Sequence, residues 1–304
     1  MSGLVFPTMN DRTGSSRTNI SDAIFLDTSV QIARLLRPQM KEPIETCVSK
    51  YRRRASGTVA LQEFKRRILK EAAYLLTKLN QTNSYTATLE YVTAVLPKMQ
   101  ERKRMICQLL LHKVLSDRSD EELTERARFY LRTILMTGEQ LFVRYIDEIV
   151  PLQNCYLARL PVQEKRRYAS YTIETKCSRT KGKCPVASFL QQKKETCLRL
   201  LAFLDQLPKE RLTSELQKAR ELVEKVANNT LNAADREEPC LKYGDLLLCL
   251  ESEGWPAFYT MNYRESQAFA DFLGQELLIR PNNPANQDQI YRISAKPWPL
   301  PAAN

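Results

Sequence analysis

Ala23-Ile24-Phe25-Leu26-Asp27-Thr28-Ser29 is the stretch that decides the fold. Four consecutive apolar residues end abruptly in three polar ones, as a buried parallel strand does where it leads into the N-terminus of a helix. The residues from 30 to 36 suit that helix, and Pro38 closes it. The stretch therefore predicts an α/β fold on a central parallel sheet, with Asp27 at the carboxyl end of the first strand.

Similar patterns recur toward both ends of the chain. They predict helices over 42–54, 62–79 and 264–273, and strands over 57–60, 257–260 and 277–279. From about 85 to 230 apolar residues instead recur three or four apart, and no strand pattern stands out. The organisation we expect is a discontinuous α/β domain (21–80 and 238–282), a large all-α insertion (81–237), a disordered N-terminus (1–20) and a Pro-rich C-terminal tail (283–304).

Charge and composition limit the function. The formal net charge is +11, which favours a polyanionic partner, nucleic acid being the commonest. No run of about eighteen apolar residues occurs, and the N-terminus lacks the pattern of a secretory signal, so we expect a cytoplasmic protein with no membrane partner. The single histidine, His112, lies in a helical pattern where packing explains it. We therefore expect chemistry that runs on carboxylates and a metal ion.

Four short blocks carry candidate carboxylates, and in order they resemble the motifs of PIN-domain nucleases of the VapC-like type. The first is Ile24 to Ser29, with Asp27, and the second is Thr58 to Phe64, with Glu63. The last two blocks are Tyr243 to Leu248, with Asp245, and Thr260 to Glu265, with Asn262 and Glu265. The resemblance covers roughly 22–80 and 238–282, and its specificity rests on the order of the blocks because each one alone is weak.

The resemblance implies a three-layer fold and a metal-dependent endonuclease that acts on RNA rather than DNA. Asp27, Glu63 and Asp245 would bind Mg²⁺ or Mn²⁺, since hard cations prefer oxygen ligands, and Asn262 and Glu265 would complete the catalytic set. Such cations generate hydroxide and neutralise the charge that develops on phosphorus. Either residue that follows Asp27, Thr28 or Ser29, is placed to hold the attacking water or a metal-bound carboxylate.

Three alternatives stay open at this point. Asp27 and Asp245 also stand where helix caps do, and Glu63 could be a first-turn acid favoured by the helix dipole. Many active relatives carry Asp where this chain has Asn262, which would fit a weak or inactive PIN-like protein that binds nucleic acid or acts as a scaffold. A toxin or defence effector nuclease, restrained by a protein partner on the helical insertion, is the third.

Two basic runs are candidate nucleic-acid contacts, with a solvated surface or a protein partner as the alternatives. The first run, within residues 50–70, is expected to lie beside the candidate catalytic Glu63, where phosphate contacts would position a strand. Aromatic side chains stack on unpaired bases. Tyr168 and Tyr171 lie beside the second run. The candidate contacts are Arg52, Arg53, Arg54, Lys65, Arg66, Arg67, Lys165, Arg166 and Arg167.

Four of the eight cysteines form a candidate second metal site. Cys177, Cys184, Cys197 and Cys240 could bind Zn²⁺ or an iron–sulfur cluster, and a proline follows Cys184 as it follows some cluster ligands. No CxxC pair is present, so unligated thiols explain the pattern equally well. The other four, Cys47, Cys107, Cys155 and Cys249, have apolar neighbours that are typical of a core.

Overall fold

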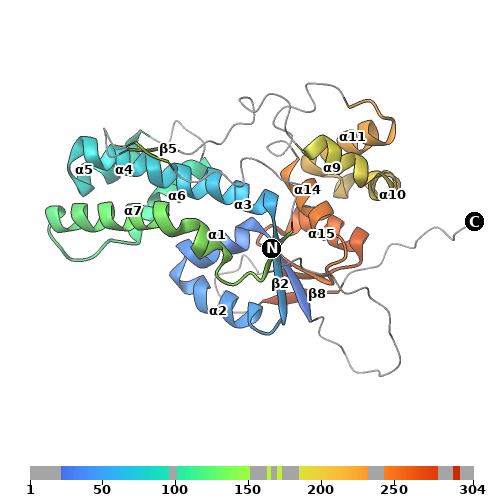
Figure 1. The fold of residues 1–304 in the computed structure, drawn as a ribbon, viewed down its shortest axis with the longest axis horizontal. Coiled ribbons are helices and arrows are strands. Elements are labelled where there is room, and N and C mark those ends of the chain that lie inside the picture. Colours follow the sequence, from blue (N-terminus) through green and yellow to red (C-terminus); the bar gives the residue numbers. More distant parts are fainter. Residues whose placement is uncertain are drawn as a thin grey trace, which may run out of the picture.

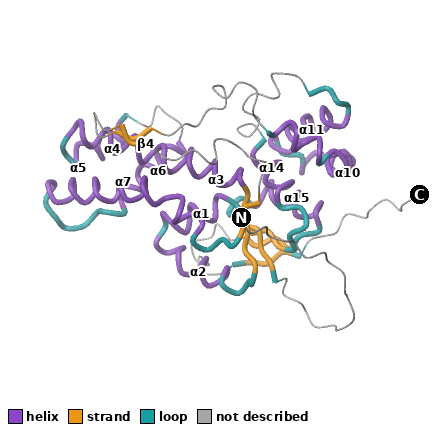
Figure 2. Tube along the Cα trace, in the orientation of Figure 1, coloured by secondary structure: helices purple, strands orange, loops and turns teal. Residues whose placement is uncertain are grey.

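A six-stranded sheet organises the molecule (Figures 1 and 2). The structure is a computed structural model, and it describes residues 22–95, 101–150, 163–165, 170–172, 185–231, 243–279 and 290–294. The strands of the main sheet lie in the order β3-β2-β1-β6-β7-β8. All neighbours are parallel except β7 and β8. The strands are β1 (Ala23–Leu26), β2 (Arg53–Gly57), β3 (Glu148–Val150), β6 (Ala257–Tyr259), β7 (Glu276–Ile279) and β8 (Tyr291–Ile293), with β4 (Gln163–Lys165) and β5 (Ser170–Thr172) in a separate antiparallel pair.

Helices cover both faces of the sheet because successive side chains of a strand point to opposite sides. In β1, Ile24 and Leu26 join one core with α1 (Thr28–Leu36) and α2 (Pro38–Val48). Phe25, between them, joins the larger core on the other face. That core includes residues of α3 (Thr58–Phe64), α14 (Gly244–Glu251) and α15 (Tyr263–Leu273).

Two groups of helices extend from this layered part, on opposite sides in Figure 1. One consists of η1 (Lys65–Leu69), α4 (Lys70–Thr82), α5 (Tyr85–Ala94), α6 (Glu101–His112) and α7 (Asp120–Val143). The other consists of α9 (Val186–Gln192), α10 (Lys194–Asp205), η4 (Lys209–Arg211) and α11 (Ser214–Ala227). Within the described ranges, no helix is long and apolar enough to cross a membrane.

The predicted α/β fold with a mostly parallel sheet is confirmed, as are the strands near 257–260 and 277–279 and the helix near 264–273. Two predictions around residue 50 are wrong. The helix expected over 42–54 occupies Pro38–Val48, and the second strand is Arg53–Gly57 rather than 57–60. The strand begins in charged residues, and Arg54 pairs with Asp147 at 2.8 Å. Only its last three residues, Ala55 to Gly57, are buried, and they are too small and too few to mark a strand in the sequence.

The all-α expectation for 81–237 is also wrong in part. β3 lies inside that segment and pairs with β2 as the edge strand of the main sheet. β4 and β5 lie in the same segment. Three-residue strands are too short to show the alternation by which a strand is identified from sequence. The predicted disordered N-terminus (1–20) and nearly all of the Pro-rich tail (283–304) lie outside the described residues, apart from 290–294, which include β8.

Candidate functional site

The candidate site forms where three parallel strands end. Leu26 pairs with Ser56 of β2 and with Tyr259 of β6, so the chain leaves all three strands at the same edge. The backbone N–H of Asp27 donates to the carbonyl of Tyr259 at 3.0 Å. The carboxyl edge of a parallel sheet is where such folds bind ligands. The first polar side chain after β1 is therefore placed at the position that the sequence predicts.

Asp27 is held by side chains and does not cap its helix. It stands at the N-cap position of α1 but makes no side-chain cap bond. Its Oδ2 accepts hydrogen bonds from the hydroxyls of Ser29 at 2.5 Å and Thr260 at 2.8 Å. Those hydroxyl oxygens in turn accept from the backbone N–H groups of Met261 and Asn262, both at 2.9 Å. The network fixes the carboxylate between β1 and the turn after β6, and capping does not explain it.

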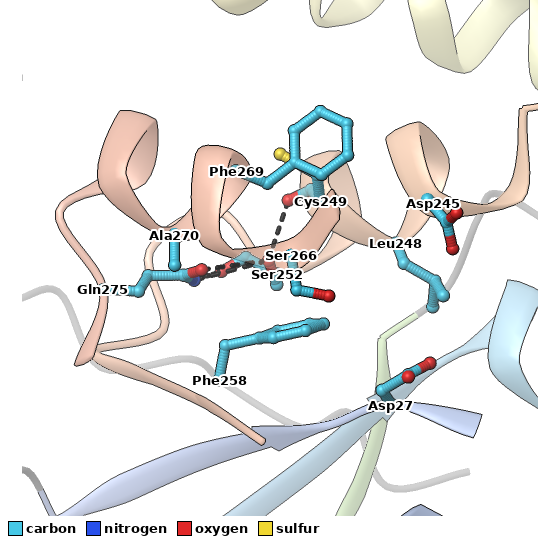
Figure 3. A pocket seen from close by; sticks show the side chains of 10 residues that line it. All are labelled: Asp27, Asp245, Leu248, Cys249, Ser252, Phe258, Ser266, Phe269, Ala270 and Gln275. Carbon is cyan, nitrogen blue, oxygen red and sulfur yellow. Dashed lines mark hydrogen bonds between the residues drawn. The ribbon is translucent and has the colours of Figure 1, made fainter. Parts of the chain in front are cut away.

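A cleft of about 1020 Å³ opens above this edge. The residues that line it include all five of the predicted catalytic residues: Asp27, Glu63, Asp245, Asn262 and Glu265. Asp245 lies in the first turn of α14, and Figure 3 shows it above the strand end that carries Asp27, with Leu248 between them. Four elements that are far apart in the sequence thus contribute carboxylates to one cleft.

The carboxylates disfavour one another's charge. Burial raises the pKa of Asp27, which is 8% exposed, and the charge of Glu63 raises it further. The pKa of Asp245 is raised to about 7, mainly by loss of hydration against the cleft wall and further by the charges of Asp27, Glu63 and Glu265. The Asp245 side chain is nevertheless open to solvent in the cleft. Such crowding of like charges is typical of sites that bind a cation or handle protons.

The donor set fits a hard divalent cation in its chemistry, but the ligands are not preassembled. Among the described residues no three His, Cys, Asp or Glu side chains are grouped closely enough to hold a metal ion. Glu63, near the end of α3 and not in its first turn, instead pairs with Arg67 one turn later. Glu63 would have to leave Arg67 to share a cation with Asp27 and Asp245.

Two buried contacts fix the helices around the cleft. The buried carboxylate of Glu251, at the end of α14, accepts from the backbone N–H of Val59 at 3.3 Å and so holds the N-terminus of α3. Burial raises the pKa of Glu251 well above its usual value. Gly57 leaves the room for this contact, because a Cβ there would lie 1.9 Å from Oε2 of Glu251. The helices that carry Glu63 and Asp245 are thereby joined.

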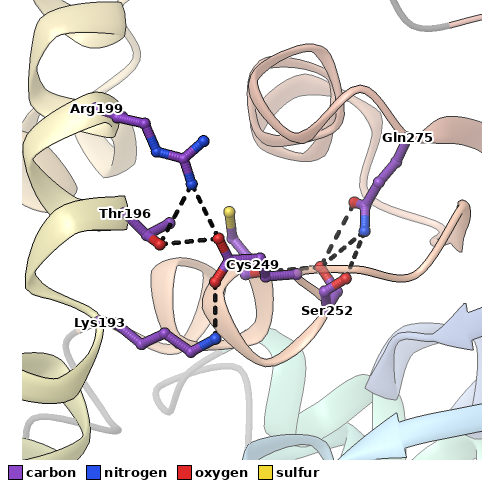
Figure 4. Close-up of polar contacts among 7 residues, drawn as sticks. Lys193, Thr196, Arg199, Cys249, Ser252 and Gln275 are labelled. Atoms are coloured by element: carbon purple, nitrogen blue, oxygen red, sulfur yellow. Dashed lines mark hydrogen bonds and ion pairs between the residues drawn. The ribbon is translucent and has the colours of Figure 1, made fainter. Parts of the chain in front are cut away.

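The second contact holds α10 against the turn after α14 (Figure 4). Glu253 accepts hydrogen bonds from Lys193 at 2.7 Å, Thr196 at 2.8 Å and Arg199 at 3.1 Å. Behind that turn, the Gln275 side chain donates to the backbone carbonyl of Ser252 at 2.7 Å. These bonds fix the α10–α11 pair beside the helix that carries Asp245.

Sequence reasoning missed the parts of the cleft that the helical segment supplies. Met105, Ile106 and Leu109 of α6 line it, as do Glu215 and Lys218 of α11. Helical periodicity shows only which face of a helix is apolar, so it carries no sign that these residues face the acids of the other blocks. His112 is exposed at the end of α6 and is not among the lining residues.

The basic residues predicted to contact nucleic acid separate into two groups. Arg66 and Arg67 line the cleft. The prediction for Lys65 is wrong, because its side chain is buried and pairs with Glu139.

The prediction that Arg52, Arg53 and Arg54 lie beside the catalytic glutamate is also wrong. They stand at the start of β2, at the sheet edge opposite the cleft, and Arg53 and Arg54 pair there with Glu148 and Asp147. Lys165 ends β4, with nothing described of its side chain, and Arg166, Arg167 and Tyr168 lie outside the described residues.

The cysteine site receives no support from the part that is described. Cys177, Cys184 and Cys240, and the predicted core residue Cys155, lie outside the described residues. Cys197 is fully buried in α10, and burial raises the pKa of its thiol to about 12, which disfavours the thiolate that a metal needs. The remaining cysteines expected in the core, Cys47, Cys107 and Cys249, are buried as predicted.

Comparison of the chain with protein-family models, with curated proteins and with solved structures found no match. The functional argument therefore rests on the residues and their arrangement.

Proposed function

We propose that this chain is a PIN-like nuclease that hydrolyses phosphodiesters with the help of Mg²⁺ or Mn²⁺. One observation carries the proposal: Asp27, Glu63, Asp245 and Glu265 come from separate elements to a single cleft at the carboxyl edge of a parallel sheet. Within the described residues neither Asp27 nor Asp245 forms an ion pair, and burial together with neighbouring acids raises the pKa of both. Four acids at one place cost stability unless a cation joins them.

The chain's own residues have distinct parts in this proposal. Ser29 and Thr260 orient Asp27, so that its carboxylate is positioned before a ligand arrives. Asp245 faces it from α14, and Glu63 becomes available when it releases Arg67. A bound divalent cation would supply hydroxide and charge neutralisation at phosphorus. RNA is the substrate that the resemblance favours.

A second candidate is a nucleic-acid-binding protein with weak or no turnover. The exposed Asn262 lines the cleft and brings an amide where a carboxylate would bind a cation more strongly. The described acids also form no ready-made group of three ligands. Under this alternative the protein binds nucleic acid, and the rate of cleavage does not depend on added Mg²⁺ or Mn²⁺.

The test compares substitutions of two aspartates that flank β1, one at each end. Asp27→Asn should abolish Mn²⁺-dependent cleavage of mixed RNA and DNA substrates, and should leave the fold intact. It should also raise the melting temperature of the metal-free protein, because it removes one of the crowded charges. The matched control is Asp22→Asn, since Asp22 is exposed just before β1, at the opposite end of that strand. Cleavage that survives both Asp27→Asn and Asp245→Asn would end the nuclease proposal at this site.

A further inference from the structure

The walls of the cleft come from helices outside the four acidic blocks. α6 contributes Met105 and Leu109 from one helical group, and α11 contributes Lys218 from the other. Figure 1 shows α6 and α11 on either side of α3 and α14. Asp27 lies at the floor between them, 8% exposed. The helical segments thus decide what reaches the carboxylates.

We infer that the cleft accepts one unpaired nucleic-acid strand, with its phosphates on Arg66, Arg67 and Lys218 and a base against Met105 and Leu109. The inference rests on the proposed function and adds the residues of this chain, outside the four acidic blocks, that hold the strand.

Cations line the cleft beside its acids and are available to contact phosphates. The lining residues with a negative charge are Asp27, Glu63, Glu215, Asp245 and Glu265, and those with a positive charge are Arg37, Arg66, Arg67 and Lys218. Two of these cations pair with an acid three or four residues earlier in the chain: Arg67 with Glu63, and Lys218 with Glu215 at 2.8 Å. These side chains remain partly open, at 37% and 52% exposed. Arg67 of η1 and Lys218 of α11 line the same cleft as the carboxylates, so a strand that contacts both cations lies in the cleft that holds the acids.

The wall on α6 supports an unpaired base. Met105 is 41% exposed, although the next residue, Ile106, is buried at 4%. Leu109 follows Met105 by one helical turn, so the two side chains share a face toward the cleft. A flexible, polarisable methionine adapts to flat apolar surfaces. In a duplex the base faces are stacked inside the helix, whereas an unpaired strand can present them to this wall.

Binding in the absence of cleavage tests the inference. The full chain carrying Asp27→Asn is titrated in the presence of Mg²⁺ into a short, fluorescently labelled oligonucleotide of mixed sequence. Four forms of the probe are compared: single-stranded RNA, single-stranded DNA and the duplex of each. Fluorescence anisotropy gives the Kd. Single strands should bind about tenfold or more tightly than duplexes, since stacking contributes for each unpaired base. Lys218→Gln should weaken single-strand binding about threefold to tenfold. Met105→Glu should weaken it about tenfold, because it places a charge where the base packs.

The matched controls are Arg118→Gln and Met136→Glu. Arg118 is 51% exposed just before α7 and pairs with Glu122 in the first turn of that helix, much as Lys218 pairs with the nearby Glu215. Met136 is 74% exposed on α7. Neither lines the cleft. Equal affinity for single strands and duplexes, no binding, or controls as harmful as the cleft variants would overturn the inference.

The two proposals fail separately. If wild-type protein cleaves but shows no preference for single strands, the nuclease stands and the inference falls. If single strands bind through Lys218 and Met105 but wild-type protein never cleaves, the strand site stands and the nuclease falls.

Discussion

Gly57 shows how one residue controls the position of a proposed ligand. It ends β2 directly before α3, and the carboxyl group of Glu251 occupies the space that a side chain would need. Glu251 is fully buried and accepts a hydrogen bond from the N-terminus of α3. The contact between α14 and α3 therefore fixes the position of the carboxyl group beside Gly57. Glu63 is carried by the same α3, six residues further on.

Gly57→Ala should therefore destabilise the protein by about 2–4 kcal/mol. The added methyl group either displaces the backbone or pushes the buried Glu251 carboxylate away from its hydrogen-bond donor. Thermal or denaturant unfolding measures the loss. Gly244→Ala is the control: Gly244 begins α14, and an added Cβ meets nothing within 4 Å. Equal melting temperatures for wild type and Gly57→Ala would show that Glu251 moves aside at little cost.

Asp245 predicts a pH dependence. Its pKa is raised from 3.8 to about 7 in the folded chain, so the folded state binds this proton more tightly than the unfolded state does. The metal-free protein should then lose stability as pH rises from about 4 to about 7, and Asp245→Asn should remove that part of the loss. Melting temperatures in chelator at about pH 5 and about pH 8 give the comparison. A variant that follows the wild-type pH profile throughout would contradict the assignment.

At the scale of elements, Arg34 joins the long helix α7 to the layered part. The side chain of this α1 residue is buried, and it donates to the backbone carbonyls of Leu141 and Phe142 near the end of α7. It also lies 4.7 Å from the ring centroid of Tyr145. Two carbonyls that no longer have partners within α7 are thus satisfied by a residue of α1.

Arg34→Leu should cost about 3 kcal/mol, since it leaves those buried carbonyls without donors. Hydrogen exchange should rise first in the last turn of α7 and in β3 rather than across the sheet. Arg132→Leu, at an exposed position of α7, should leave stability within about 0.5 kcal/mol of wild type. Uniform loss of protection across all elements would mean that Arg34 stabilises the whole fold and not this junction.

An element can be predicted when the residues that determine it are adjacent in the sequence, and it cannot when it depends on pairing with a distant segment. β1 and the start of α1 are predictable because a buried strand and its polar end are adjacent in sequence, and the position of Asp27 followed from them. β3 is not predictable, since its pairing depends on β2, about ninety residues earlier, and its own three residues show no period. Arg52 to Arg54 read as a basic surface near Glu63, but the strand that they begin carries them to the opposite edge.

At the scale of the whole molecule, the same distinction applies to the cleft. The acidic blocks predict its floor, because each acid lies in or next to an element that the sequence pattern indicates. Its walls depend on how α6 and α11 pack, and Lys218 reads in sequence as one more exposed helical lysine. Only the fold shows that it lines the same cleft as Asp245 and Glu265.

The net charge of +11 raises the question of whether the whole surface or the cleft binds nucleic acid. If the whole surface attracts nucleic acid, every exposed cation contributes equally to the salt dependence of binding.

If instead a single strand contacts Arg66, Arg67 and Lys218, the slope of log affinity against log salt should be about −2, at about 0.7 per phosphate contact. Lys218→Gln should then reduce the magnitude of the slope by about 0.7. Arg52→Gln, at an exposed residue by the far edge of the sheet, should leave it unchanged. Anisotropy titrations of a short single strand over a range of salt concentrations measure all three slopes. The same reduction in both variants would assign the binding to the surface as a whole, and an effect of Arg52→Gln alone would place the strand at the opposite edge of the sheet from the carboxylates.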